Sequence, residues 1–149
     1  MGTKKMKTDL DFEHQVWLQR GLCYYCDKEM SQDEGIVSPL PPSHVTRDHY
    51  IANSRGGKRI VASCHRCNNI KGDWGAERFR KVVRELLQNE AIDAAWHEQV
   101  PGLDATLRRA VFIERMKDKQ REKPSIHRQR RIKREIIIFL RQVKKLGSR

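Results

Sequence analysis

Residues 64–73 of the chain read Cys-His-Arg-Cys-Asn-Asn-Ile-Lys-Gly-Asp, and residues 23–26 read Cys-Tyr-Tyr-Cys. These two segments contain all four cysteines of the chain. Two residues between a pair of thiols let one turn present both sulfurs to a metal ion about 2.3 Å away, and two such turns complete a tetrahedral site with no open position. We therefore predict a closed, structural zinc site with four ligands: Cys23, Cys26, Cys64 and Cys67.

This prediction depends on the cellular compartment. The Lys-rich start of the chain lacks the apolar stretch of a signal peptide, and no apolar run approaches the roughly 20 residues of a membrane-spanning helix. We expect a cytoplasmic protein with no membrane partner, in which paired cysteines bind metal before they form disulfides. Disulfides stay the alternative, and His65 could replace one thiolate as a ligand.

The 37 residues between the cysteine pairs predict a β-hairpin. Residues 45–52 alternate weakly between apolar and polar and fit one strand, and residues 59–63 fit a second. The intervening Gly56-Gly57 pair is typical of a connecting turn. A helix is expected from about Cys64 to Lys71, and it places the second cysteine pair at the helix start.

Helices are expected on both sides of this core. Before it, residues 9–20 predict a short helix that stops at Gly21. After Gly72 a longer helix is expected, with Asp73 as its N-cap. Further helices are predicted around Trp96 and from Asp104 to Gln120. A basic amphipathic helix is predicted over residues 126–146, with an apolar stripe made of Ile132, Ile136, Phe139, Leu140, Val143 and Leu146.

The net charge of +12 is concentrated in two segments. Residues 121–149 hold 11 basic and 2 acidic side chains, and residues 44–72 hold six Lys or Arg against Asp48 alone. A local excess of this kind is what a phosphate-contacting surface requires, and it predicts a DNA partner. We expect three regions: a metal-binding domain over 1–90, a helical extension over 91–120 and a basic tail over 121–149. The apolar stripe would let the tail pack on the body, form a homodimer or bind a partner protein, and a membrane surface is the weaker alternative.

The motifs, in their order along the chain, resemble the HNH endonuclease family. The resemblance covers residues 21–79, and three elements carry it: Asp48-His49, Ser54-x-Gly56-Gly57 and Cys64-x-x-Cys67-Asn68-x-x-Lys71-Gly72. It implies an α+β fold with a small ββα-metal (His-Me finger) core held by a zinc knot and followed by a mainly helical half. It also implies a single catalytic metal that bridges the scissile phosphate and the leaving 3′-oxygen, so that a 5′-phosphate is left.

The residue types inside this core suit phosphodiester hydrolysis. His49 is the candidate general base, because an imidazole can accept a proton from water at neutral pH. Asp48 points to the opposite strand face and offers a hard oxygen ligand for Mg²⁺ or Mn²⁺. Asn68, just after a zinc thiolate, can bring a second ligand to the same ion. We therefore predict a metal-dependent endonuclease acting on DNA, and a zinc-knuckle nucleic-acid-binding protein without catalysis is the alternative.

Basic side chains around these residues are the candidates for phosphate contacts. They are Arg47, Arg55, Lys58, Arg59, Arg66 and Lys71 in the core, and Arg128, Arg130, Arg131, Lys133 and Arg134 in the tail. Arg59 stands where the family has an Asn that fixes the hairpin loop, so the chain departs from the family pattern there. No base-reading motif is visible, which leaves the target sequence and the choice between single and double strands open.

Overall fold

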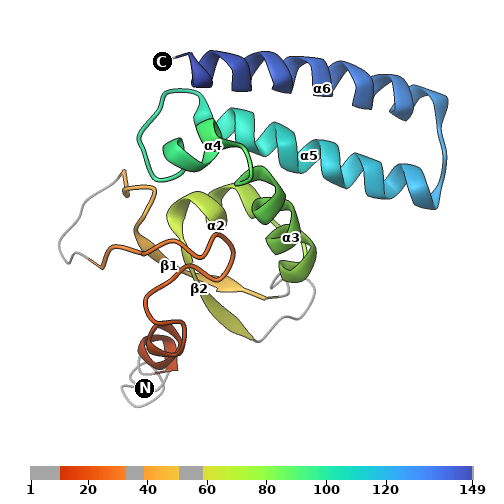
Figure 1. Cartoon of the computed structure of the whole chain (residues 1–149). Coiled ribbons are helices and arrows are strands. Elements are labelled where there is room, and N and C mark those ends of the chain that lie inside the picture. Colours follow the sequence, from red (N-terminus) through yellow and green to blue (C-terminus); the bar gives the residue numbers. More distant parts are fainter. Residues whose placement is uncertain (1–10, 33–38, 51–58, 149) are drawn as a thin grey trace. The chain divides into compact units, whose positions relative to one another are not determined.

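The structure is a computed structural model, and it describes residues 11–32, 39–50 and 59–148 (Figure 1). The chain divides into two compact units, Met1–Arg84 and Glu85–Arg149. The fold is α+β: the first unit holds a two-stranded antiparallel sheet, and the second unit is helical. None of the helices in the described ranges is long and apolar enough to cross a membrane.

The predicted hairpin is confirmed for the residues that the structure describes. Strands β1 (Val45–His49) and β2 (Ile60–Cys64) pair in antiparallel register, with Val45 opposite Cys64 and His49 opposite Ile60. The connecting turn at 53–58 and the end of the predicted first strand at 51–52 lie outside the described residues.

Helix α2 (His65–Lys71) follows β2 without a linker. Cys64 is its N-cap, and the Cys64 sulfur accepts a hydrogen bond of 3.4 Å from the Cys67 backbone N–H. The helix ends at Gly72, whose φ of +60° favours glycine. Figure 1 shows α2 lying against the hairpin, so the end of β2 and the start of α2 form one rigid corner.

Helix α3 (Ala76–Leu86) begins two residues later than an N-cap at Asp73 predicts. The positive φ at Gly72 turns the chain, and the Tyr50 carbonyl accepts the Ala76 backbone N–H at 3.2 Å, so Asp73 lies in the turn and is not the N-cap. The apolar face of α3 buries Phe79, Val82 and Val83. The core of the first unit also includes the β2 residue Val61.

The second unit contains α4 (Glu90–Ala95), α5 (Leu103–Glu122) and α6 (Ile126–Gly147). Gly102, with a positive φ, stands before α5, so Asp104 lies inside the first turn and is not the cap. There its carboxylate is near the positive end of the helix dipole. Helix α6 runs back alongside α5 (Figure 1), and Ile132, Ile136 and Phe139 pack on the α5 core residues Ile113 and Met116.

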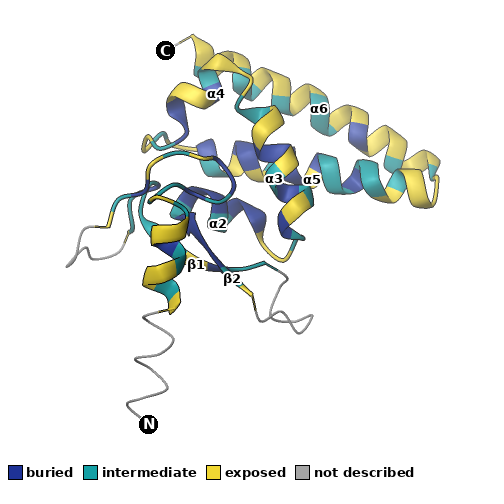
Figure 2. Ribbon diagram, turned by 60° about the horizontal axis from the view of Figure 1, so that its bottom comes forward, coloured by how far each residue is buried: buried dark blue, intermediate teal, exposed yellow. Residues whose placement is uncertain are grey.

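One member of the predicted α6 stripe was assigned wrongly. Leu140 is 58% exposed, whereas Ile132 is buried and the remaining stripe residues are at least partly covered. The covered positions 132, 136, 139, 143 and 146 are spaced by four and three residues, which keeps them on one face of a helix. Leu140 is one position away from this face and is turned about 100° from Phe139. Figure 2 shows the outer side of α6 as largely exposed.

Candidate functional site

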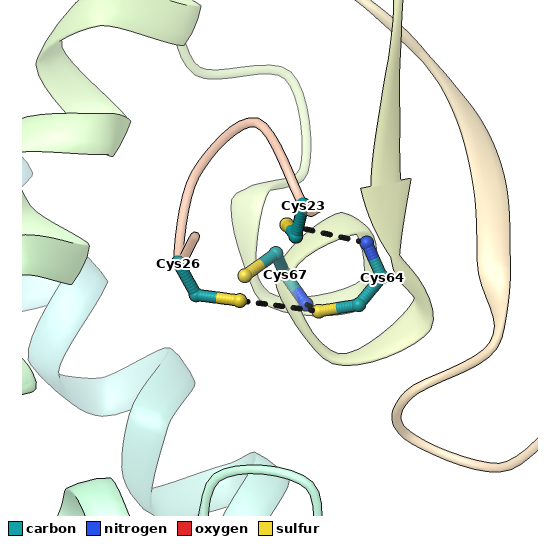
Figure 3. Close-up of side chains that lie close together, drawn as sticks. All are labelled: Cys23, Cys26, Cys64 and Cys67. Atoms are coloured by element: carbon teal, nitrogen blue, oxygen red, sulfur yellow. Dashed lines mark hydrogen bonds between the residues drawn. The ribbon is translucent and has the colours of Figure 1, made fainter. Parts of the chain in front are cut away.

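The four cysteines come together as the sequence predicted. Their sulfurs all lie within 4.8 Å of one another, each residue is buried, and Cys26 Sγ is 3.8 Å from Cys64 Sγ (Figure 3). Four sulfurs bound at about 2.3 Å to one tetrahedral ion are about 3.8 Å apart, whereas a disulfide requires about 2.05 Å. All four are free thiols. The cluster could therefore hold a structural metal such as zinc, and His65 is not part of it.

Backbone N–H groups point at the cluster sulfurs. Cys23 Sγ accepts hydrogen bonds from the N–H groups of Tyr25 at 3.4 Å and Cys64 at 3.3 Å. Burial, together with hydrogen bonds from neighbouring cysteines, raises the pKa of the Cys64 and Cys67 thiols well above its ordinary value. A buried thiolate needs a cation to compensate its charge, and a divalent metal among these sulfurs would supply it.

Asp48 is held inside the first unit by two side chains. Its Oδ2 atom accepts a short hydrogen bond from the Tyr25 hydroxyl and lies 3.4 Å from Lys71 Nζ. The residue is buried, as alternation along β1 requires for a side chain on the face toward α2. Its other carboxylate oxygen, Oδ1, takes part in neither contact.

Lys71 has a different role from the predicted one. The sequence analysis assigned it to a phosphate contact, but the residue is 1% exposed. Its ammonium pairs with Asp48 and also donates a hydrogen bond of 3.3 Å to the backbone oxygen of His49. Lys71 therefore binds the end of α2 to the end of β1, and it compensates the charge of the buried carboxylate.

Tyr25 is the residue that sequence reasoning missed. It lies between two cluster cysteines, its ring packs edge-on against Phe79 at 4.9 Å between centroids, and its hydroxyl reaches Asp48. Burial, with the hydrogen bond to Asp48, raises its pKa above the ordinary range, so the phenol keeps the proton that it donates. Nothing in the local sequence separates Tyr25 from Tyr24, because only the tertiary fold brings one of them to β1.

Asn68 lies on the same side of β1 as Asp48. Its Nδ2 atom donates to Thr46 Oγ1 at 3.1 Å and to the backbone oxygen of Arg47 at 3.2 Å. Thr46 is two residues before Asp48, and side chains two apart share a strand face. As at Asp48, the Oδ1 atom of Asn68 takes part in neither contact. Each of the two predicted ligands thus keeps one oxygen outside the bonds that hold it.

His49 ends β1 and points to the opposite face of the strand from Asp48. The residue is partly exposed, and its imidazole has no hydrogen-bond partner among the residues that the structure describes. Only its backbone is bound, through Lys71 and the pairing with Ile60. An imidazole with a fixed backbone and a ring open to solvent can accept a proton from water.

These residues fit a divalent cation in their chemistry. Mg²⁺ and Mn²⁺ prefer oxygen ligands, and Asp48 and Asn68 each offer an Oδ1 atom next to the same strand. The Lys71 ammonium already balances the carboxylate charge, so the protein itself supplies little net attraction for a cation. Such an ion would therefore bind weakly and keep waters in its coordination shell.

The predicted phosphate-binding residues of the first unit separate into three groups. Arg47 and Arg59 are exposed, with their guanidinium groups over the rings of Phe12 at 4.8 Å and Tyr50 at 4.3 Å. Arg66 is only 4% exposed. Its placement, like that of Lys71, therefore does not match the predicted phosphate contact. Arg55 and Lys58 lie outside the described residues.

An exposed cluster of two tyrosines and a carboxylate lies beside the end of β1. Glu77 Oε1 accepts hydrogen bonds from Tyr24 at 2.5 Å and Tyr50 at 2.8 Å. These bonds, from Tyr24 first, lower the pKa of the Glu77 carboxyl. Because Tyr50 directly follows His49, the hydrogen bonds to Glu77 hold the chain in place immediately after the candidate base.

Taken together, the first unit contains a buried four-cysteine cluster, a carboxylate and an amide on one face of β1, and a partly exposed histidine on the other. Tyr25 joins the cluster to the carboxylate. Comparison of the chain with protein-family models, with curated proteins and with solved structures finds no significant match.

Proposed function

We propose that the chain is a metal-dependent HNH endonuclease that hydrolyses DNA phosphodiester bonds, with a ββα-metal core formed by β1, β2 and α2. One observation carries the proposal: α2, which begins at the cysteine cluster, hydrogen-bonds Asn68 to β1 directly beside Asp48-His49. That arrangement unites the two ligand types and the base type that the reaction needs, on elements held by the cluster.

In the proposed reaction His49 removes the proton from an attacking water. The water oxygen forms a bond to phosphorus, the bond from phosphorus to the 3′-oxygen breaks, and the leaving alkoxide takes a proton from solvent. Asp48 and Asn68 would hold the divalent ion. When bound, that ion would neutralise charge on the phosphoryl oxygens and stabilise the leaving oxygen. Lys71 and Tyr25 keep the Asp48 carboxylate oriented, with Oδ1 available.

The test is nicking of supercoiled plasmid DNA with Mg²⁺ or Mn²⁺. Loss of a general base typically slows a reaction by about 10²–10⁴-fold, so His49→Ala should abolish nicking on the time scale of the assay. His14→Ala is the matched control, because His14 is an exposed histidine of the same unit. Zinc content and circular dichroism should be unchanged in both variants. Cleavage by His49→Ala at the wild-type rate would exclude His49 as the base.

A second candidate function is a zinc-knuckle module that binds nucleic acid without cutting it. The contact between Lys71 and Asp48 favours it, because a carboxylate already paired with an ammonium attracts a cation less. This function predicts that the wild-type chain binds DNA, and that it leaves plasmid intact with every divalent metal and pH tested. Nicking that is lost with His49→Ala would exclude it.

A further inference from the structure

A groove on the second unit runs between α5 and α6 close to the turn that joins them. It has a volume of about 860 Å³. One wall is formed by α5, with Phe112 and Lys119, and the other by α6, with Arg130, Arg131, Lys133 and Arg134. The lining contains six Lys or Arg side chains and no carboxylate, so the groove has a strongly positive potential.

Three acidic side chains of this helical hairpin pair with cations that do not line the groove. Glu135 binds Arg109 at 2.8 Å, Glu114 binds Lys117 at 3.1 Å, and Asp118 binds Arg121. Within the described part of the chain, none of the six groove cations pairs with a carboxylate, and four of them have no hydrogen-bond or ring partner either: Lys119, Arg130, Lys133 and Arg134. Unpaired like charges close together destabilise a fold by mutual repulsion. Their arrangement does not stabilise the hairpin, and the phosphates of an anionic partner would compensate these charges.

The spacing of these cations fits a phosphate backbone. Residues 127, 130, 131 and 134 share one helix face, and they span about 10 Å at a rise of about 1.5 Å per residue. A strand carries one negative charge per nucleotide along its backbone, so cations spread over this length can contact neighbouring phosphates. Arg128 instead stabilises the turn between α5 and α6, because its Nη1 atom donates a hydrogen bond of 2.6 Å to the Lys123 backbone oxygen.

The groove also contains an aromatic ring among its cations. Phe112 is 38% exposed, and the Arg131 guanidinium lies 4.9 Å from its ring centroid. Cations that follow a backbone, together with an aromatic ring or a guanidinium plane on which a base can stack, are the combination that binds single-stranded nucleic acid. The bases of a duplex are already stacked on one another and would leave Phe112 unused.

We propose that the groove between α5 and α6 binds a segment of single-stranded nucleic acid. Phosphates contact Lys119, Arg130, Lys133 and Arg134, and one base stacks on the pair formed by Phe112 and Arg131. This site belongs to the second unit and does not depend on the proposed nuclease activity. It would bind a displaced or unpaired strand. The groove would therefore distinguish single strands from duplexes and would not distinguish base sequences.

The test is fluorescence anisotropy of the full chain, carrying His49→Ala so that no probe is cut. The probes are a labelled thymidylate strand and a mixed-sequence duplex, each of about twelve nucleotides per strand. We expect substitutions in the groove to weaken binding of the single strand more than binding of the duplex. The groove variant Arg130→Gln/Lys133→Gln/Arg134→Gln should lower the slope of log affinity against log salt by about 2, because each phosphate contact on a single strand contributes about 0.7.

Phe112→Leu keeps an apolar side chain but removes the ring. It should weaken single-strand binding by about 5- to 100-fold with the salt slope unchanged, and Phe112→Tyr should bind like the wild type. The matched charge control is Arg141→Gln/Lys144→Gln/Lys145→Gln, which removes three charges from α6 outside the groove lining. Its loss of affinity should be less than that of the groove variant.

Three outcomes would overturn the proposal: a groove variant that loses as much affinity for the duplex as for the single strand, an equal loss in the two triple variants, or unchanged binding by Phe112→Leu. A thermal melt of each variant shows whether the hairpin stays folded. The plasmid assay reports on the first unit separately. A chain that nicks plasmid but whose single-strand affinity does not depend on the groove residues would therefore refute only this inference. A chain that binds single strands in the groove but never nicks plasmid would refute only the nuclease.

Discussion

Tyr25 donates its hydroxyl hydrogen bond to the carboxylate of Asp48. Its backbone N–H donates at the same time to the sulfur of Cys23, so one residue connects the cysteine cluster with the candidate catalytic strand. A metal in the cluster would fix the position of Tyr25, and through it the orientation of Asp48. The cluster would therefore close the long loop between the two cysteine pairs and would also orient Asp48.

Tyr25→Phe should separate the orientation of Asp48 from metal binding by the cluster. A hydrogen bond to a charged group contributes about 1.5–3 kcal/mol, and its loss leaves one buried carboxylate oxygen less satisfied. We expect the free energy of unfolding to fall by about that amount and plasmid nicking to slow, with zinc content unchanged. Urea denaturation and metal analysis measure the two effects.

Tyr24→Phe is the matched control for that variant. Tyr24 is the neighbouring tyrosine, but its hydroxyl bonds the exposed Glu77, so its removal should change the free energy of unfolding by under about 1 kcal/mol. Equal losses in both variants would show that the link between Tyr25 and Asp48 has no special role.

Lys71→Met should destabilise the protein strongly. Removing one partner of a buried ion pair leaves an uncompensated charge and typically costs about 3–5 kcal/mol. Both side chains of this pair are nearly inaccessible to solvent. The double variant Lys71→Met/Asp48→Asn should recover part of the loss, because it removes the unpaired charge as well. A double variant that is as unstable as the sum of the single variants would show that the pair is not coupled.

The cysteine cluster predicts a defined count of protected thiols. Every cysteine of the chain is in the cluster, so a thiol reagent should find none reactive while metal is bound and four after chelation. Cys26→Ser should lose bound zinc. Because a structural zinc site contributes about 10–16 kcal/mol in small domains, the first unit should then unfold. Stoichiometric zinc in this variant, or reactive thiols in the wild type, would contradict the structural site.

The Glu77 cluster predicts a dependence of stability on pH. Hydrogen bonds from Tyr24 and Tyr50 lower the pKa of Glu77 in the folded protein. A carboxyl with a lowered folded pKa contributes stability that is present above its ordinary pKa, and the contribution is lost as the pH falls through the folded pKa. Tyr24→Phe/Tyr50→Phe should therefore raise the Glu77 pKa and reduce stability at neutral pH, but not at strongly acidic pH. An NMR titration of the Glu77 carboxyl carbon measures the shift, and an unchanged titration curve would refute the assignment.

The local pattern of the sequence predicted the order of elements in the first unit. Cysteine pairs with two intervening residues, alternation in residues 45–49 and the glycine after Lys71 are signals that act over a few residues, so they can be interpreted without the fold. The first residues of α3 and α5 could not be predicted from such short-range signals. Asp73 and Asp104 both have the residue type of an N-cap, but backbone turns at Gly72 and Gly102 decided where α3 and α5 begin.

Composition and short-range spacing were enough to predict the metal-binding residue types, the hairpin and the distribution of charge. The contacts of Lys71 and Tyr25, and the groove that combines Phe112 from α5 with cations from α6, depend on how the folded chain packs. One cause underlies each of these cases. Whether a cation faces solvent or a buried carboxylate depends on which distant segment packs on it, and spacing along the chain carries no information about that neighbour.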